Sequence, residues 1–166
     1  MTEQVVLSAE SVCKEFSIKG KPAVLALDDV SLYGLKGKVT GLVGADGAGK
    51  TTLIRIAAGL LVPTSGHVRV LDLDSVVDSL EIQSRVGYMP QRFGLYQDLS
   101  VMENLDLYAD LQGVPVRERP ERYDRLLTMT DLAKYTKRRA GALSGGMKQK
   151  LGLACALIKS PELLLL

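Results

Sequence analysis

A glycine-rich octapeptide ending in Lys-Thr is the segment of this sequence with the clearest chemical meaning. It runs Gly44-Ala45-Asp46-Gly47-Ala48-Gly49-Lys50-Thr51 and matches the pattern G-x-x-x-x-G-K-T. Glycines allow backbone angles that turn successive N–H groups toward an anion, and a helix beginning at the end of the loop adds the positive end of its dipole. The loop therefore predicts a site for the phosphates of a nucleoside triphosphate.

Two side chains of this loop have separate expected roles. Lys50 carries a positive charge that can reach the β- and γ-phosphates, and the hydroxyl of Thr51 is placed to ligate Mg²⁺. A glycine-rich turn beside an ordinary lysine is the alternative, but it leaves unexplained the apolar strand-like segment 38–43 before the loop and the helix-like segment 51–58 after it. By itself the loop does not distinguish kinases, GTPases and ATP-driven machines.

The elements that must position this loop follow from hydrophobic patterning. Strands are expected at 5–16, 30–33, 38–43, 67–71 and 86–89, helices at 51–58, from 100 onward, at 118–129 and at 148–157, and a buried strand begins at 163–166. Ser100 and Glu103 have the spacing of a capping box. The pattern predicts an α/β domain over 1–166 with a helical subdomain inserted at about 92–142.

Charge and composition restrict the possible partners. The 166 residues carry 21 basic and 19 acidic side chains, which demands neither nucleic acid nor an anionic membrane as partner. Cys13 and Cys155 form no C-x-x-C and are interpreted as small buried apolar residues. Because no leader peptide or long apolar run is evident, we expect a cytoplasmic chain, attached to a membrane only through another subunit.

Acid-to-base pairs at i,i+4 spacing occur in the segment 118–129. They are Glu118 with Arg122 and Glu121 with Arg125. Such pairs stabilise an exposed helical face. The interleaved acids favour a solvated face over a surface for nucleic acid.

A second candidate phosphate grip precedes the helix at 148–157. The segment Leu143-Ser144-Gly145-Gly146-Met147 offers backbone donors and a hydroxyl at a helix N-terminus, although alone it could be an N-cap with a tight turn. A P-loop, a Gln after a strand, a helical insertion and then Leu-Ser-Gly-Gly is the order found in nucleotide-binding domains of ATP-binding cassette (ABC) proteins. The chain resembles these domains along nearly its whole length.

The resemblance implies a role for each matching residue. The Walker A segment would hold ATP with Gly44, Ala45, Asp46, Gly47, Ala48, Gly49, Lys50, Thr51 and Thr52. Phe16, otherwise a core strand residue, would stack on adenine, and Gln91 would meet Mg²⁺ and the attacking water and sense the transmembrane partner. The residues Leu143, Ser144, Gly145, Gly146 and Met147 resemble the signature motif, which grips the γ-phosphate of ATP bound to a second subunit. His67 lies in an early strand and does not match the switch histidine of the family.

The same resemblance suggests a transport function. Met147 stands where the signature commonly has Gln, a variant that occurs in ATPases of ABC-2-type exporters, and the segment 93–105 resembles the part that faces the permease in multidrug-type efflux systems. The resemblance therefore implies a subunit that couples ATP binding and hydrolysis to export through a membrane permease, working with a second ABC ATPase domain at the cytoplasmic face. Alternatives are a soluble ABC ATPase of DNA repair or translation, a P-loop kinase or GTPase, and a nucleotide-binding fragment without hydrolysis.

The family places its Walker B aspartate and catalytic glutamate just after a strand like that at 163–166. Neither residue, nor the switch histidine, follows within this sequence. We therefore expect these 166 residues to be the N-terminal part of an ABC ATPase domain, incomplete at the C-terminus. Such a chain would keep nucleotide contacts, hydrolyse ATP poorly and expose apolar surface at its unpaired strands.

Overall fold

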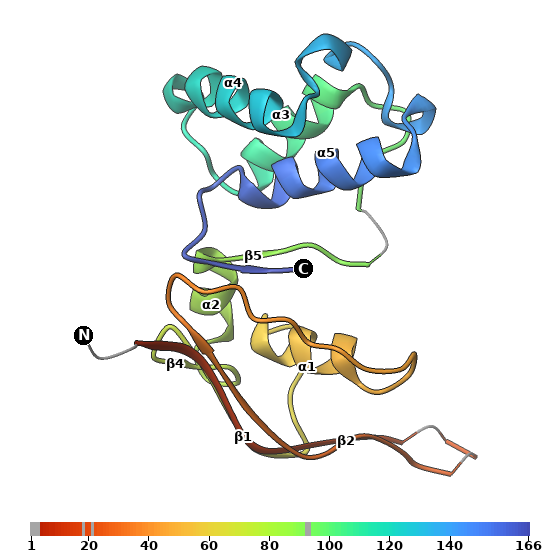
Figure 1. Cartoon of the computed structure of the whole chain (residues 1–166), viewed down its shortest axis with the longest axis vertical. Helices are drawn as coiled ribbons and strands as arrows, with labels where there is room; N and C mark the ends of the chain where they lie inside the picture. The colour runs from red at the N-terminus through yellow and green to blue at the C-terminus, as the bar shows by residue number, and fades with distance from the viewer. Residues whose placement is uncertain (1–3, 18, 21, 92–93) are drawn as a thin grey trace. The chain divides into compact units, whose positions relative to one another are not determined.

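The computed structural model describes residues 4–17, 19–20, 22–91 and 94–166, and Figure 1 shows the course of the chain. It consists of two compact units, Met1–Arg85 and Val86–Leu166. Each unit combines strands and helices, as the predicted α/β class requires. Within the described residues, no helix is long and apolar enough to cross a membrane.

An antiparallel sheet forms the base of the first unit. Its strands are β1 (Val5–Phe16), β2 (Val24–Leu35), β3 (Ser65–Val70) and β4 (Leu73–Asp74), in the order β2-β1-β3-β4. Figure 1 shows β1 and β2 as a long pair running side by side. The predicted strands at 5–16, 30–33 and 67–71 are present, although the second begins six residues earlier than expected.

Two helices accompany this sheet. Helix α1 (Lys50–Ala57) buries Leu53, Ile56 and Ala57, and the chain turns away at Gly59, whose φ is +67°. The predicted helix at 51–58 is therefore confirmed. Helix α2 (Ser79–Arg85) was not expected from the pattern, because its seven residues bury only Ile82 and leave no apolar stripe to recognise.

The predicted strand at 38–43 is wrong for this structure. No strand occurs between Lys36 and Gly49, and the Val43 side chain is 93% exposed. The apolar composition is that of a strand covered on both faces, but a strand also needs a hydrogen-bonded neighbour. None of the described segments of the first unit supplies one at this position.

In the second unit, a run of helices lies along the chain between two short strands that pair in parallel. Strand β5 (Val86–Tyr88) pairs in parallel with β6 (Leu163–Leu165), so both predicted strands are confirmed with slightly shorter bounds. Between them come α3 (Val101–Leu111), η1 (Val116–Glu118), α4 (Arg119–Thr130), η2 (Ala133–Tyr135), η3 (Ala140–Ala142) and α5 (Gly145–Leu157). One buried cluster that runs from Leu95 to Ile158 joins α3, α4 and α5. The boundaries 92–142 of the helical subdomain stay a prediction.

The predicted capping box begins helix α3. The Ser100 hydroxyl accepts a hydrogen bond from the Glu103 N–H at 3.2 Å, and the Glu103 carboxylate accepts one from the Ser100 N–H at 2.7 Å. Hydrogen bonding of the Ser100 side chain and backbone N–H to the Glu103 carboxyl lowers the pKa of Glu103 below its usual value. The local sequence signal therefore predicted the start of this helix correctly.

The arginines of α4 have a structural role that the pattern did not show. Arg122 forms the predicted ion pair with Glu118 at 2.7 Å, but it also donates to the carbonyl of Ile158 at 2.9 Å. Among the described residues, Arg125 forms no ion pair with Glu121 and instead donates to the Ser160 hydroxyl at 3.1 Å. Besides lying on a partly exposed face, these arginines tie α4 to the end of α5.

A buried asparagine fixes the loop that leads into α3. The Asn104 side chain is fully buried, and its Oδ1 accepts from the Tyr96 N–H at 3.0 Å. Its Nδ2 donates to the carbonyls of Tyr96, Leu99 and Ser100 at 3.1, 3.3 and 2.9 Å. A buried side-chain amide with this many backbone partners holds the 96–100 loop against the helix.

Replacing this amide should destabilise the second unit. In Asn104→Ala the Tyr96 N–H and three backbone carbonyls lose their buried partner, and we expect the free energy of unfolding to fall by about 2–4 kcal/mol. Urea unfolding followed by circular dichroism measures the change. Leu111→Ala, in the same helix at a 70% exposed position, should change the value by less than about 0.5 kcal/mol; equal effects of the two substitutions would contradict the role of Asn104.

Candidate functional site

The P-loop leads directly into helix α1. Gly49 is the N-cap residue and has a left-handed backbone with φ of +85°, and Gly47 has φ of +79°. The first turn of α1 contains no acidic residue. The N–H groups at its N-terminus therefore remain available to an anion, as the sequence predicted for a phosphate loop.

Gly49 is required by a close approach as well as by its backbone angle. A Cβ added at this position would collide with the carbonyl oxygen of Ala26 and would lie 2.8 Å from Leu27 Cδ2. At Gly47 an added Cβ would meet no atom within 4 Å. Strand β2 thus supports the N-terminus of α1, and only glycine permits the contact.

The Lys50 ammonium lies over the beginning of its own loop. It donates to the carbonyls of Gly44 and Ala45 at 2.7 and 2.6 Å. Residues 41–48 are exposed to solvent, whereas Gly49 and Lys50 are half-buried. The loop therefore presents a positive charge and free N–H groups on an accessible surface.

The first turn of α1 also carries the hydroxyl groups of the motif. Thr51 is exposed and Thr52 is half-buried. A hydroxyl oxygen is a suitable ligand for Mg²⁺, which usually completes its coordination with phosphate oxygens and water. Within the described residues, no group of three or more His, Cys, Asp or Glu side chains could hold a metal.

Phe16 lies in the same unit as the P-loop. It is the last residue of β1, it pairs with Val24 of β2, and its side chain is 37% exposed. Val24 precedes Ala26, the residue against Gly49, by two positions, which is about 7 Å along a strand. The ring is therefore not part of the buried core, and the same stretch of β2 supports both the ring and the loop.

Gln91 and the signature segment belong to the second unit. Gln91 is exposed and lies three residues after the end of β5. Two residues before it, the Met89 N–H donates to the Leu165 carbonyl at 2.9 Å. Ser144 is the N-cap of α5, and its hydroxyl accepts from the Met147 N–H at 3.3 Å. The N-cap role weighed from the sequence is thus present.

The signature segment is anchored at one end and open in the middle. Leu143 is 6% exposed and belongs to the buried cluster, whereas Ser144, Gly145 and Gly146 are exposed. A Cβ added at either glycine would meet no atom within 4 Å. The hydroxyl and the first N–H groups of α5 are therefore accessible from outside, and their contact with a phosphate stays a prediction.

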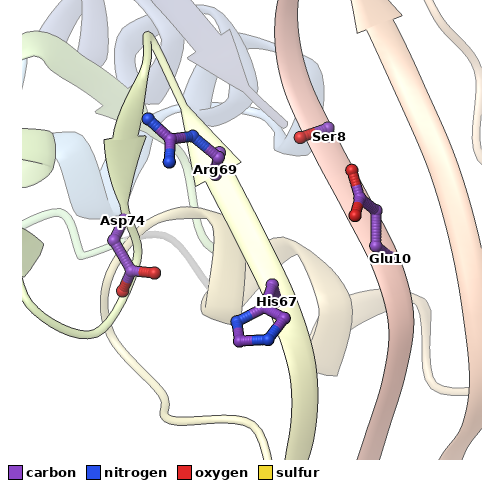
Figure 2. A pocket seen from close by; sticks show the side chains of 5 residues that line it. All are labelled: Ser8, Glu10, His67, Arg69 and Asp74. Atoms are coloured by element: carbon purple, nitrogen blue, oxygen red, sulfur yellow. The ribbon is translucent and has the colours of Figure 1, made fainter.

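His67 lies in a separate polar pocket on the sheet of the first unit. Figure 2 shows the five side chains that line the pocket, from β1, β3 and β4: Ser8, Glu10, His67, Arg69 and Asp74. Arg69 donates to the carbonyl of Asp72 at 2.6 Å, and Asp74 accepts from backbone N–H groups at 2.8 and 3.1 Å.

The polar groups of this pocket are held largely by the backbone around them. The N–H groups of Val77 and Val76 lower the pKa of Asp74 below its usual value. The sequence analysis missed the pocket because it depends on the pairing of Glu10 with His67 and of Ser8 with Arg69 across two strands. The period-two alternation of polar residues in β1 and β3 was the signal that could have indicated it.

The fold and the two glycine loops define a P-loop cassette of the ABC ATPase type. Residues 27–166 match the family model described as ABC transporter. The chain belongs to this family, as an ATP-binding domain.

Curated relatives match nearly the whole chain. It is 52% identical over 161 residues to the probable multidrug ABC transporter ATP-binding protein YbhF of Escherichia coli (strain K12), covering 97% of this chain and 27% of the relative. It is 38% identical over 146 residues to the ABC transporter ATP-binding protein NatA of Bacillus subtilis (strain 168), covering 87% and 59% respectively. The chain therefore spans about a quarter of the first relative and less than two thirds of the second.

Solved structures agree with the fold. The dimeric structure of a post-hydrolysis state of the ATP-binding cassette MJ0796, bound to ADP and Pi, matches with a TM-score of 0.83 and 26% identity, covering 95% of this chain and 72% of that one. The structure of an ATP binding subunit of an ABC transporter matches with a TM-score of 0.80 and 28% identity, covering 96% and 64%. The predicted ABC ATPase fold class is confirmed.

The two glycines of the P-loop provide a test of the close approach to β2. Both Gly47→Ala and Gly49→Ala place a side chain on a left-handed backbone, which costs about 1–2 kcal/mol. Only Gly49→Ala also forces Ala26 away, so we expect it to lower the free energy of unfolding by at least about 1 kcal/mol more than Gly47→Ala does. Urea unfolding of the two variants measures the difference; equal values would contradict the contact.

Proposed function

We propose that this chain is the nucleotide-binding part of an ATPase subunit that drives export of a substrate through a membrane permease. The carrying observation is the presence in one chain of two helices whose N-termini follow or contain glycine-rich segments, α1 after the P-loop and α5 at Ser144. At the first, the Lys50 ammonium donates to the carbonyls of its own exposed loop, and at the second the Ser144 hydroxyl caps the helix. The similarity to a probable multidrug transporter protein supports export as the direction of transport.

The P-loop would bind the triphosphate of ATP. The N–H groups of α1 and the Lys50 ammonium, which can turn from the Gly44 and Ala45 carbonyls to phosphate oxygens, neutralise the phosphate charge. Phe16 offers an exposed ring for the adenine base. Bound Mg²⁺, held through Thr51, would supply positive charge that polarises the phosphoryl oxygens.

The signature loop would complete the site of a second ATPase domain. The Ser144 hydroxyl and the N–H groups of α5 face outward, where the γ-phosphate bound to another domain can reach them. Such an arrangement makes dimerisation part of the active site, and the dimeric form of the MJ0796 cassette supports it. Gln91 would orient the attacking water, and hydrolysis would then depend on positioning and charge rather than on covalent chemistry.

The permease partner would place the chain peripherally at the cytoplasmic face of the membrane. Tyr96, five residues after Gln91 in the sequence, exposes an aromatic side chain in the second unit and is 56% exposed. The chain presents no spanning helix of its own in the described residues. Contact with the membrane would therefore depend on a separate subunit.

Removing the Ser144 hydroxyl should separate dimerisation from nucleotide binding. We expect Ser144→Ala to bind ATP like the unaltered protein. Its affinity for the second copy in the presence of ATP should fall about tenfold or more, because one charge-assisted hydrogen bond is worth about 1.5–3 kcal/mol. Analytical ultracentrifugation with and without ATP measures the association.

Ser100→Ala is the matched control, since it also removes a helix N-cap in the second unit. It should lose a similar amount of stability, about 1 kcal/mol, without affecting dimerisation. Normal ATP-driven dimerisation of Ser144→Ala would contradict the proposed role of the signature segment in binding ATP held by a second ATPase domain.

The export role is tested in membranes. We expect the protein to co-purify with a membrane-spanning permease, because the proposed coupling requires a stable complex. Affinity purification from detergent-solubilised membranes, followed by identification of the partner by mass spectrometry, measures this. Recovery with ribosomes or DNA-repair proteins, and without any membrane-spanning partner, would support the soluble alternative.

A further inference from the structure

A lysine lies against the ring of Phe16. Lys14 and Phe16 are two residues apart on β1 and share one face of the strand, and the Lys14 Nζ lies 5.1 Å from the centroid of the ring. Lys14 is half-buried, and among the described residues it forms no ion pair with an acidic side chain. The aromatic ring is thus the partner that the structure gives to its ammonium.

This face of the strand pair is the one that meets the P-loop. Lys14 pairs across the ladder with Leu27, which is 4% exposed and whose Cδ2 approaches Gly49. The register then shifts, so that Glu15 pairs with Leu25 and Ala26 is left as an extra residue. A bulge of this kind bends the strand, and here it places the Ala26 carbonyl against Gly49.

We propose that Lys14 is a positioning residue for the nucleotide base, in that its ammonium covers one face of the Phe16 ring and leaves the opposite face for a purine. This inference rests on the proposed nucleotide-binding function. A cation attracts the negative face of an aromatic ring and polarises it, which strengthens stacking of an electron-rich base on the other face. The contact also holds the ring in one orientation before the ligand arrives, so less freedom is lost on binding.

A different role for Lys14 is general attraction of phosphates. Its charge would then act on any polyphosphate, whether or not a base is attached. The two roles make opposite predictions for inorganic tripolyphosphate, which has the charge of the nucleotide but nothing to stack. Comparing this ion with ATP therefore separates them.

The experiment compares Lys14→Met with Lys36→Met by isothermal titration calorimetry in Mg²⁺. Methionine keeps much of the length and the apolar character of the lysine stem without its charge, and Lys36 is an exposed lysine just after β2. We expect Lys14→Met to weaken the affinity for ATP about two- to fivefold, which is the range of one exposed cation–π contact, and to leave the affinity for tripolyphosphate unchanged. Lys36→Met should change the affinity for neither ligand.

Two further variants test whether the two affinities respond to the phosphate site and to the ring as expected. Lys50→Met should weaken the affinity for both ATP and tripolyphosphate, because it removes a phosphate contact. In a Phe16→Leu background, Lys14→Met should no longer affect ATP, since the ring through which it acts is gone. A persistent effect of Lys14→Met in that background would overturn the proposal.

The remaining outcomes are also decisive. If Lys14→Met weakens the affinity for ATP and for tripolyphosphate equally, Lys14 is a residue that attracts phosphate. If the affinity for ATP is unchanged, Lys14 has no role in binding. Either result overturns this inference without contradicting the proposed nucleotide site. If the unaltered protein, with its circular dichroism spectrum intact, binds neither ligand, the proposed function itself fails and this inference fails with it.

Discussion

The contact between Gly49 and Ala26 is the constraint on which the nucleotide site depends. Helix α1 can begin against β2 only because residue 49 has no side chain and accepts a left-handed backbone. The positive end of α1 and the Lys50 ammonium are thereby held beside the strand pair that carries Phe16. One glycine thus links the proposed phosphate site to the proposed base site, which lie 33 residues apart in the sequence.

The second unit positions its glycine loop by burial rather than by close approach. Helix α5 is held through Leu151, Ala154, Cys155 and Ile158, and Leu143 extends the same cluster to the start of the loop. Burial raises the pKa of the Cys155 thiol to about 12, so this thiol stays protonated at neutral pH. Cys155 is therefore a core residue, as its sequence context indicated, and α5 serves as a rigid support for Ser144.

Local signals were readable from the sequence, whereas long-range pairing was not. The helix after the P-loop and the capping box at Ser100 each depend on residues within a few positions, and both were predicted correctly. The segment 38–43 has the composition of a strand but lacks a paired neighbour, and Arg122 looked solvated because the Ile158 carbonyl is 36 residues away. The bulge at Ala26 leaves no mark on the hydrophobic pattern, so the support of Gly49 could not be foreseen.

The two glycine loops differ in what makes glycine necessary. At Gly49 the protein itself excludes a side chain, but at Gly145 and Gly146 an added Cβ meets nothing within 4 Å and neither residue has positive φ. Glycine inside a helix costs about 1 kcal/mol relative to alanine, so two of them in the first turn of α5 have no internal steric reason. A group that approached this turn closely from outside would supply one, since a side chain would keep it from the N–H groups. This requirement is the physical basis for proposing that the phosphate held by a second ATPase domain docks at Ser144.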